Sequence, residues 1–472
     1  MTMSLNVTSH AAEASTPGNV PDETAFPVAT RVLEGIAQDV LRFAREGGAS
    51  AAETEVSQAV GQSVTVRKGD VETIAYNRDK GISVTVYLGQ QRGSASTADF
   101  APASLRAAVG KALAIARYTA ADPAAGLADP ARLATEEQLA RTIRALDLYH
   151  PWRIGVDEAI ALGKATEAAA LAVDRRITNS DGATVSAGES EFVYGNSNGF
   201  ASGYRSSRHG IDCAVVGDER GAMQRDFWYT AARAPEDLLA AEAVGRIAGE
   251  RTARRLNARS LGTLECPVLF EAPEAADLVG AFVQAVSGGS LYRRSSFLLD
   301  SLGTEVFAPH VSIREEPFIP RARGSTPFDA EGVATAARDV VRDGVVEGYF
   351  LGSYSARKLG MASTANAGGA HNLVVSHGAD DFAGMLRRMG RGLLVTEQLG
   401  QGINPVTGDF SRGAAGFWVE DGVIAYPVEE ITIAGNLRDM LRGIVAIGAD
   451  VDTRGSRHVG SMLIDRMTVA GR

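Results

Sequence analysis

The sequence predicts an α+β fold of two domains, with an N-terminal antiparallel sheet flanked by helices and a β-rich C-terminal domain. Apolar residues recur at helical spacing near the start, several later runs alternate apolar and polar residues, and Asp-Gly pairs separate β-rich runs towards the end. The 472 residues exceed what one core needs at about 150 residues per domain. We therefore expect a tail over 1–27, an N-terminal domain over 28–260 and a C-terminal domain over 261–472.

The N-terminal domain is expected to open with a helix, because apolar residues from Thr30 follow a helical period that ends at Gly47-Gly48. Four short alternating runs then predict separate strands of an antiparallel meander. These runs are ETEVSQAV, QSVTVR, VETIAY and GISVTVYLG. A second helix stops before Asp122-Pro123. Further helix and strand patterns follow, and a long helix over PEDLLAAEAVGRIAGERTARRL is expected to close the domain near Leu261.

The C-terminal domain is expected to begin with the short strand CPVLF and the buried helix EAADLVGAFVQAV, which Gly288-Gly289 should break. Asp343-Gly344 and Asp421-Gly422 each lie between β-rich runs and predict hairpins, because such turns need positive φ. LRDMLRGIVAIGAD predicts one late helix, and SMLIDRMTVAG predicts the last strand.

Composition excludes several classes of protein. The net charge of −10 and the lack of any Lys/Arg block disfavour nucleic acid as a partner. Cys213 and Cys266 are the only cysteines and have no metal-type spacing, so we expect a reducing cytoplasm and no disulfide framework. No apolar run approaches the roughly 18 to 20 residues of a membrane span. The first 26 residues lack the charge and apolar run of a secretory signal.

No motif for catalysis stands out from the residues alone. His371 and His377 lie six apart, which is not a recognised zinc pattern, and structural roles are the preferred interpretation. Ser355 and Lys358 only superficially match a serine–lysine nucleophile. Two glycine-rich runs, GGSLYRR and NAGGAHN, could cradle an anion, but close backbone packing is the favoured alternative.

Several longer spellings together are similar to those of a known family. They are GSASTADF, ARYTAADPAAGLAD, GGSLYRRSSFLLDSLG, STPFDAEGV, SYSARKLGMASTANAGGAHN and TGDFSRGAAGFWVEDGVIAYPVEEITIAGNL. In this order they resemble the TldD/PmbA family, a U62-like peptidase family, and more closely its PmbA (TldE) branch. The resemblance runs from about Thr30 to the C-terminus.

The resemblance implies a two-domain subunit that pairs with a TldD-type catalytic subunit. The pair would form a zinc-dependent cytoplasmic protease acting on unfolded or flexible peptides. In that family the catalytic subunit carries HExxxH, in which two imidazoles bind zinc and a glutamate deprotonates the bound water. The matching positions here are Gly280, Ala281 and Ala285, none of which offers a zinc donor. The family's third ligand, a cysteine near the C-terminus, also has no counterpart after Cys266.

We therefore expect no catalytic residue, metal ligand or cofactor in this chain, and zinc in the TldD-type partner. The candidate contacts to peptide in a shared chamber are polar groups beside glycine-rich turns, weighed equally against structural hydrogen bonds. These candidates are Tyr292, Arg293, Arg294, Tyr354, Arg357, His371, Asn372 and Arg412.

Two alternatives from other classes stay open. The chain could be a regulatory protein-binding protein of the gyrase-modulator type, without a role in hydrolysis. It could also be an independent hydrolase that uses Ser355 or another nucleophile. The sequence further leaves open a homodimer of the isolated chain.

Overall fold

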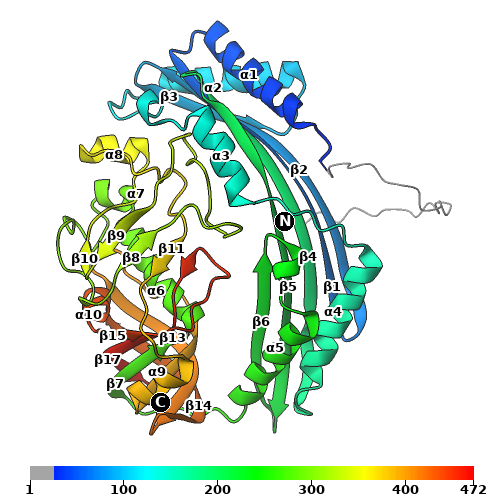
Figure 1. The fold of residues 1–472 in the computed structure, drawn as a ribbon, viewed down its shortest axis with the longest axis vertical. Coiled ribbons are helices and arrows are strands. Elements are labelled where there is room, and N and C mark those ends of the chain that lie inside the picture. The colour runs from blue at the N-terminus through cyan, green and yellow to red at the C-terminus, as the bar shows by residue number, and fades with distance from the viewer. Residues whose placement is uncertain (1–25, 472) are drawn as a thin grey trace, which may run out of the picture.

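The computed structural model describes residues 26–471. The tail predicted for 1–27 lies outside the described residues except for its last two. Helices and strands are mixed throughout the described chain, which confirms the α+β class. A long antiparallel sheet bends around the C-terminal part of the chain (Figure 1). We refer below to the long sheet and to the C-terminal part, residues 264–470.

The long sheet has six strands in the order β3-β2-β1-β4-β5-β6, and every neighbouring pair is antiparallel. Its strands are β1 (Ala51–Arg67), β2 (Asp70–Leu88), β3 (Gln91–Thr97), β4 (Ile177–Asn196), β5 (Ala201–Glu219) and β6 (Ala222–Ala232). The prediction of four short strands over residues 51–88 is wrong, because the chain forms two long ones. Gly61 does not end a strand but pairs with Gly188 in the middle of the sheet.

Helices cover one face of the long sheet at its two ends. At one end lie α1 (Thr30–Glu46) and α2 (Pro102–Tyr118), whose apolar sides pack on the start of β1 and the end of β2. At the other end lie α4 (Val156–Leu171) and α5 (Ala241–Arg255). These two helices approach closely because Gly245 has no side chain, since a Cβ there would lie 1.9 Å from the Thr166 carbonyl oxygen.

The last helix of this region is shorter than predicted. Residues Pro235–Asp237 form a single 3₁₀ turn, and α5 begins only at Ala241. The proline fits the first turn of a helix, but the next residues leave helical geometry, with Leu238 at ψ 145°. One more helix, α3 (Glu136–Leu146), begins at a reciprocal cap formed by Thr135 and Gln138. Its Leu139 packs in a cluster with Phe200 beside the sheet and Phe328 of the C-terminal part.

The C-terminal part contains a six-stranded sheet, ordered β14-β13-β12-β7-β17-β15, and a smaller sheet ordered β10-β9-β8-β11-β16. The strands are β7 (Leu264–Phe270), β8 (Ile313–Glu315), β9 (Arg338–Arg342), β10 (Val345–Val346), β11 (Leu373–Val375), β12 (Gly392–Leu399), β13 (Asp409–Glu420), β14 (Val423–Asn436), β15 (Ile444–Ile447), β16 (Arg457–His458) and β17 (Met462–Ala470). The helices are α6 (Ala272–Ala285), α7 (Gly288–Tyr292), α8 (Ser353–Leu359), α9 (Phe382–Met389) and α10 (Leu437–Arg442).

Both predicted Asp-Gly hairpins are confirmed, as β9–β10 and β13–β14. The prediction of one late helix is wrong in part, because α10 stops at Arg442. The apolar residues after Gly443 form β15 instead, which pairs with β17 and buries Ile444 and Ile447. The expected break at Gly288-Gly289 also needs correction. The pair begins α7, where the Ser287 hydroxyl accepts a hydrogen bond from the Ser290 backbone N–H.

Among the contacts between the C-terminal part and the N-terminal elements, two lie at opposite ends of the long sheet. In the first, α8 binds the loop that follows α2. Tyr354 and Lys358 each bind the Asp122 carboxylate at 2.8 Å. Arg357 donates to the backbone carbonyls of Ala124, Gly126 and Leu127.

The second contact is a buried arginine cluster on α5 at the opposite end of the sheet. Arg251 Nη1 lies 2.8 Å from Glu271, and Arg255 Nη1 lies 2.5 Å from Glu397. Both arginines also bind Asp226 of β6. These contacts hold the C-terminal part against the sheet at both ends.

Candidate functional site

Two connected cavities lie between the long sheet and the C-terminal part. The first has a volume of about 690 Å³ and the second about 1140 Å³. Ala59, Asp79 and Ser190 line both of them. The cavities are therefore one continuous cleft, with strands of the long sheet on one side, called the floor below, and loops of the C-terminal part on the other.

Small residues form the floor of the cleft. Ser57, Ala59 and Gly61 alternate along β1, and Ala59 pairs with Ser190 while Gly61 pairs with Gly188 on β4. Directly paired residues lie on the same face of a sheet, so these side chains share the cleft face. Side chains this small leave room for an extended chain above the sheet. The sequence shows these small residues at alternate positions, a pattern that indicates an open sheet face, but the predicted strands did not include this feature.

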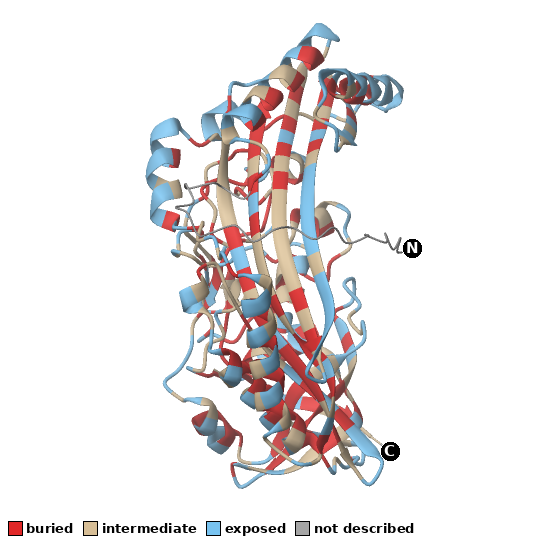
Figure 2. Cartoon of the chain, turned by 90° about the vertical axis from the view of Figure 1, so that its right-hand side faces the viewer, coloured by how far each residue is buried: buried red, intermediate tan, exposed pale blue. Residues whose placement is uncertain are grey.

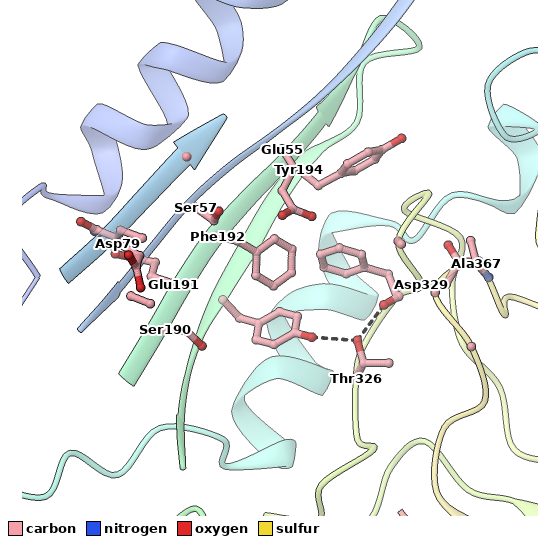
Figure 3. Close-up of a pocket in the computed structure, with 18 of the residues that line it drawn as sticks. Glu55, Ser57, Asp79, Ser190, Glu191, Phe192, Tyr194, Thr326, Asp329 and Ala367 are labelled. Atoms are coloured by element: carbon pink, nitrogen blue, oxygen red, sulfur yellow. Dashed lines mark hydrogen bonds between the residues drawn. The ribbon is translucent and has the colours of Figure 1, made fainter. Parts of the chain in front are cut away.

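Aromatic rings form one wall of the first cavity. Phe328, from a loop of the C-terminal part, packs against Phe192 and Tyr204 of the sheet, with ring centroids 6.0 and 5.8 Å away. The Tyr204 hydroxyl is hydrogen-bonded to Thr326 at 3.0 Å (Figure 3). This wall fixes the loop against the sheet and offers an apolar surface beside the polar floor.

Carboxyl groups in the first cavity are partly withdrawn from water. Partial desolvation raises the pKa of Glu55 above its usual range, although the residue as a whole is exposed. Burial raises the pKa of Asp329 to about 6, although its carboxylate accepts hydrogen bonds from the backbone N–H groups of Glu331, Val333 and Ala367. Those bonds tie two loops together, so Asp329 shapes the wall of the cavity.

An unpaired strand edge borders the cleft. β3 pairs only with Ile82–Leu88, so β2 has no partner on that side over residues 70–81 within the described chain. Figure 2 shows this stretch as the long exposed segment of the strand at the edge of the sheet. Asn77, Asp79 and Lys80, within it, line the cavities. Free backbone N–H and C=O groups of such an edge can pair with another extended chain.

The helix α6 carries the positions at which the resemblance places zinc ligands. Ala285 is buried, and its carbonyl accepts a 2.6 Å hydrogen bond from Ser296. Ala281 packs on the hydrophobic core. Beside Gly280 lies the guanidinium of Arg457, whose Cζ would be 2.7 Å from a Cβ at that position. Arg457 also donates to the Ala276 carbonyl at 3.3 Å.

These residues do not fit a zinc ion. Gly280, Ala281 and Ala285 have no donor side chain, and a guanidinium occupies the space next to the first of them. Cys266 lies buried in β7, where burial raises its thiol pKa to about 11, opposite to the thiolate that a metal needs. Among residues 26–471 no group of three or more His, Cys, Asp or Glu side chains could hold a metal ion.

Comparison with known proteins identifies the family. Residues 52–116, 149–256 and 263–471 match domain 1, the central domain and the C-terminal domain of the PmbA/TldA metallopeptidases. The chain belongs to the PmbA/TldD family. It is 46% identical to Metalloprotease PmbA of Escherichia coli O157:H7 over 94% of this chain and 97% of that protein. It is 44% identical to a Metalloprotease PmbA homolog of Haemophilus influenzae over 91% and 94% of the two chains.

Solved structures share the fold of this PmbA/TldD chain. A crystal structure described as a candidate modulator of DNA gyrase from Bacteroides thetaiotaomicron has a TM-score of 0.86 and 27% identity, over 93% of this chain and 99% of that one. TldE from Thermococcus kodakarensis has a TM-score of 0.80 and 19% identity, over 92% and 100%. No helix in the described part of the chain is long and apolar enough to cross a membrane.

The residues predicted to contact peptide lie in three separate places in this PmbA/TldD chain. Tyr354 and Arg357 belong to the α8 contact, where their polar atoms bind the loop after α2. Tyr292 packs edge-on against Tyr354 at 5.7 Å, and Arg293 lies over the Tyr292 ring. Arg294 is exposed, with a positive φ of 56°. None of these five lines the two cavities.

The remaining three predicted contacts are buried or paired. His371 lines the first cavity, but its ring binds the Ala365 carbonyl, and burial lowers its pKa. Asn372 is fully buried and bridges Glu316, Ser325 and Gly324. Arg412 lies 3.4 Å from Asp277 on α6. The contact role stays a prediction, and His371 is the one member of the set that lies at the cleft.

Two serines in spellings typical of nucleophiles lack a catalytic setting. Ser355 donates to the Gly352 carbonyl and packs against Gly288, where a Cβ would lie 2.2 Å from its Oγ, while Lys358 binds Asp122. Gly288 therefore allows close packing of α7 and α8, which is the alternative favoured over anion binding for the run GGSLYRR. Ser197 lies in the run GNSNG, but at the hairpin between β4 and β5, and its hydroxyl accepts a hydrogen bond from Ala52. A nucleophile elbow needs a strand followed by a helix.

Proposed function

We propose that this chain is the PmbA/TldE-like, non-catalytic subunit of a heteromeric TldD-type zinc metalloprotease that cleaves unfolded or flexible peptides in the cytoplasm. The observation that carries the proposal is the state of α6. Where the family's catalytic subunit has HExxxH, this chain has Gly280, Ala281 and Ala285, with the Arg457 guanidinium beside them. A fixed positive charge at that place opposes the binding of a divalent cation. The zinc and its catalytic base then belong to the partner.

The cleft supports a role in holding peptide. Its floor is lined with small residues, its wall offers aromatic rings, and the free edge of β2 runs along it. An extended peptide that adds to this edge would be bound through its backbone, and therefore with little dependence on its sequence. In a folded protein most backbone N–H and C=O groups are already paired, so few of its segments can add in this way. This chain would thus select unfolded segments and hold them near the partner's metal site.

The test compares this chain alone, a TldD-type subunit alone, and the two expressed together. We expect cleavage of an unstructured peptide by the pair and none by this chain. Chelator-insensitive cleavage by this chain alone would contradict the proposal. If the two chains form no complex and this chain does not affect cleavage, the regulatory protein-binding alternative gains support instead.

Pairing at the strand edge can be tested with a modified peptide. Methylation of alternate backbone nitrogens removes the donors that antiparallel pairing needs but leaves the side chains unchanged. We expect this analogue to bind the chain at least tenfold more weakly than its parent, which corresponds to the loss of one or two hydrogen bonds at about 1 kcal/mol each. Equal binding of the two peptides would rule out strand addition.

A further inference from the structure

Three arginines at the second cavity have no acidic partner among residues 26–471. Other charged residues of its lining are matched in ion pairs, since Asp452 binds Arg454 and Glu189 binds Arg153 outside the cavity. Arg321 binds Asp237 and also Asp147 and Glu236, so the cavity as a whole is not basic. The lining residues that form no ion pair are Arg208, Arg233, Arg323 and Asp79. Positive charge is therefore concentrated where the three unpaired arginines lie.

Two of the three arginines lie close together where β6 ends. His209 of β5 pairs with Ala232, the last residue of β6, so Arg208 lies opposite Arg233, the first residue after the strand. Arg233 also donates a hydrogen bond to the Ser207 carbonyl. Like charges at neighbouring positions of a sheet destabilise it. The third, Arg323, is drawn towards them, because Arg233 donates a 3.0 Å hydrogen bond to its backbone carbonyl. Such an arrangement is typical of a site that an anion completes.

The three guanidiniums differ in how much of their bonding capacity is free. Arg233 is half-buried and donates to the backbone carbonyls of Ser207, Ala322 and Arg323, which hold it in place without neutralising it. Burial lowers its pKa, as expected for a cation with no counter-ion. Arg208 and Arg323 are exposed on the cavity side, and neither forms an ion pair within the described chain. Their donors are available to a ligand.

His458 borders the same cavity but offers no group to a ligand. It is only 7% exposed, and its ring is hydrogen-bonded to the Gly455 backbone. Its Nε2 has no hydrogen-bond partner and is closed off from solvent. The groups available to a ligand are therefore the exposed guanidiniums, and a bound peptide has the carboxylate that they lack.

We infer that the second cavity is a carboxylate-binding site for peptides, in which Arg208 and Arg323 bind the carboxylate beside the anchored Arg233. The inference rests on the proposed role of this chain in binding peptide, and it adds a substrate class. A guanidinium binds a carboxylate through two parallel N–H···O bonds. The carboxylate could be the peptide's C-terminus or an aspartate or glutamate side chain. In either case, peptides with a carboxylate at this distance along the cleft would be preferred.

The test measures binding of fluorescently labelled, unstructured peptides to the full chain by anisotropy. Three peptides of Gly, Ser and Val are compared: one with a free C-terminal carboxylate, one with a C-terminal amide, and an amide with one internal Asp. We expect the plain amide to bind about tenfold more weakly than the free acid, in line with the loss of a charged hydrogen-bonded contact. The internal Asp peptide then shows whether a side chain can supply the carboxylate.

Variants of the exposed arginines provide the second arm. Arg208→Gln and Arg323→Gln should each weaken the free-acid peptide several-fold and leave the plain amide unchanged, whereas Arg246→Gln on the outer face of α5 should change neither. Because Arg208 and Arg323 are exposed, these variants should fold. Equal binding of acid and amide, or equal weakening of both by the variants, would overturn the carboxylate site. If no peptide binds at all, the proposed peptide-binding role fails with it.

Discussion

Removal of Arg251 should destabilise the protein far more than removal of another arginine on the same helix. Its guanidinium binds Asp226 at 3.2 Å and Glu271 at 2.8 Å, and the three side chains are 10%, 6% and 19% exposed. Loss of one partner from a buried ion pair leaves an uncompensated charge and costs about 3–5 kcal/mol. Arg255 still binds Asp226 in the Arg251→Met variant, so only Glu271 loses its partner. We therefore expect a loss near the lower end, about 3 kcal/mol.

The assay is urea denaturation followed by tryptophan fluorescence, because the ring of Trp228 lies 5.0 Å from the Arg251 guanidinium and reports on this contact. Arg246→Met is the matched control. Arg246 is 60% exposed and its only acidic partner in the described chain, Glu250, is 3.9 Å away, so the expected change is within about 0.5 kcal/mol of zero. A loss below about 1 kcal/mol for Arg251→Met would refute the view that this cluster joins the C-terminal part to the sheet.

Two further substitutions test packing and burial. Gly288→Ala should destabilise the protein by about 1–3 kcal/mol in urea denaturation, because the new Cβ would lie 2.2 Å from Ser355 Oγ, whereas Gly110→Ala, with open space around it in α2, should be neutral or stabilising. A neutral Gly288→Ala would contradict the close approach of α7 and α8. Burial raises the pKa of Glu274 to about 7, compared with 4.5 in the unfolded chain. The folded state therefore holds this proton more tightly than the unfolded state, and the free energy of unfolding falls as the pH rises from about 4.5 to 7. Glu274→Gln should abolish that loss, up to about 3 kcal/mol, and parallel pH profiles of the two proteins would exclude a buried, protonated Glu274.

Strong local signals in the sequence predicted much of the fold. The helical period from Thr30 and the Asp-Gly pairs at residues 343–344 and 421–422 report on local geometry, and the structure has a helix and two hairpins there. Errors arose where tertiary contacts override local preference. Gly61 looked like the end of a strand, but it pairs with Gly188 from far along the chain. The apolar run at Ile444 looked helical, but pairing with β17 makes it a strand.

The cleft could not be predicted from the sequence, because tertiary contacts bring its lining residues together from distant parts of the chain. Arg208 lies on β5 and Arg233 directly follows β6, whereas Arg323 lies in a loop 90 residues further along the chain. No spacing rule brings these residues together. The three positions that match the HExxxH motif could be named from the sequence, because the family resemblance aligns the motif with Gly280, Ala281 and Ala285. The arginine beside these positions could not be predicted. Arg457 belongs to β16, and only the folding of the smaller sheet brings it next to Gly280 of α6.

The zinc content of the purified chain tests the absence of a metal site most directly, measured by inductively coupled plasma mass spectrometry before and after mixing with a TldD-type subunit. We expect far less than one zinc per isolated chain and an unfolding temperature that EDTA does not change, with stoichiometric zinc only in the complex. One tightly held zinc per isolated chain, whose removal by EDTA lowers the unfolding temperature, would contradict this expectation.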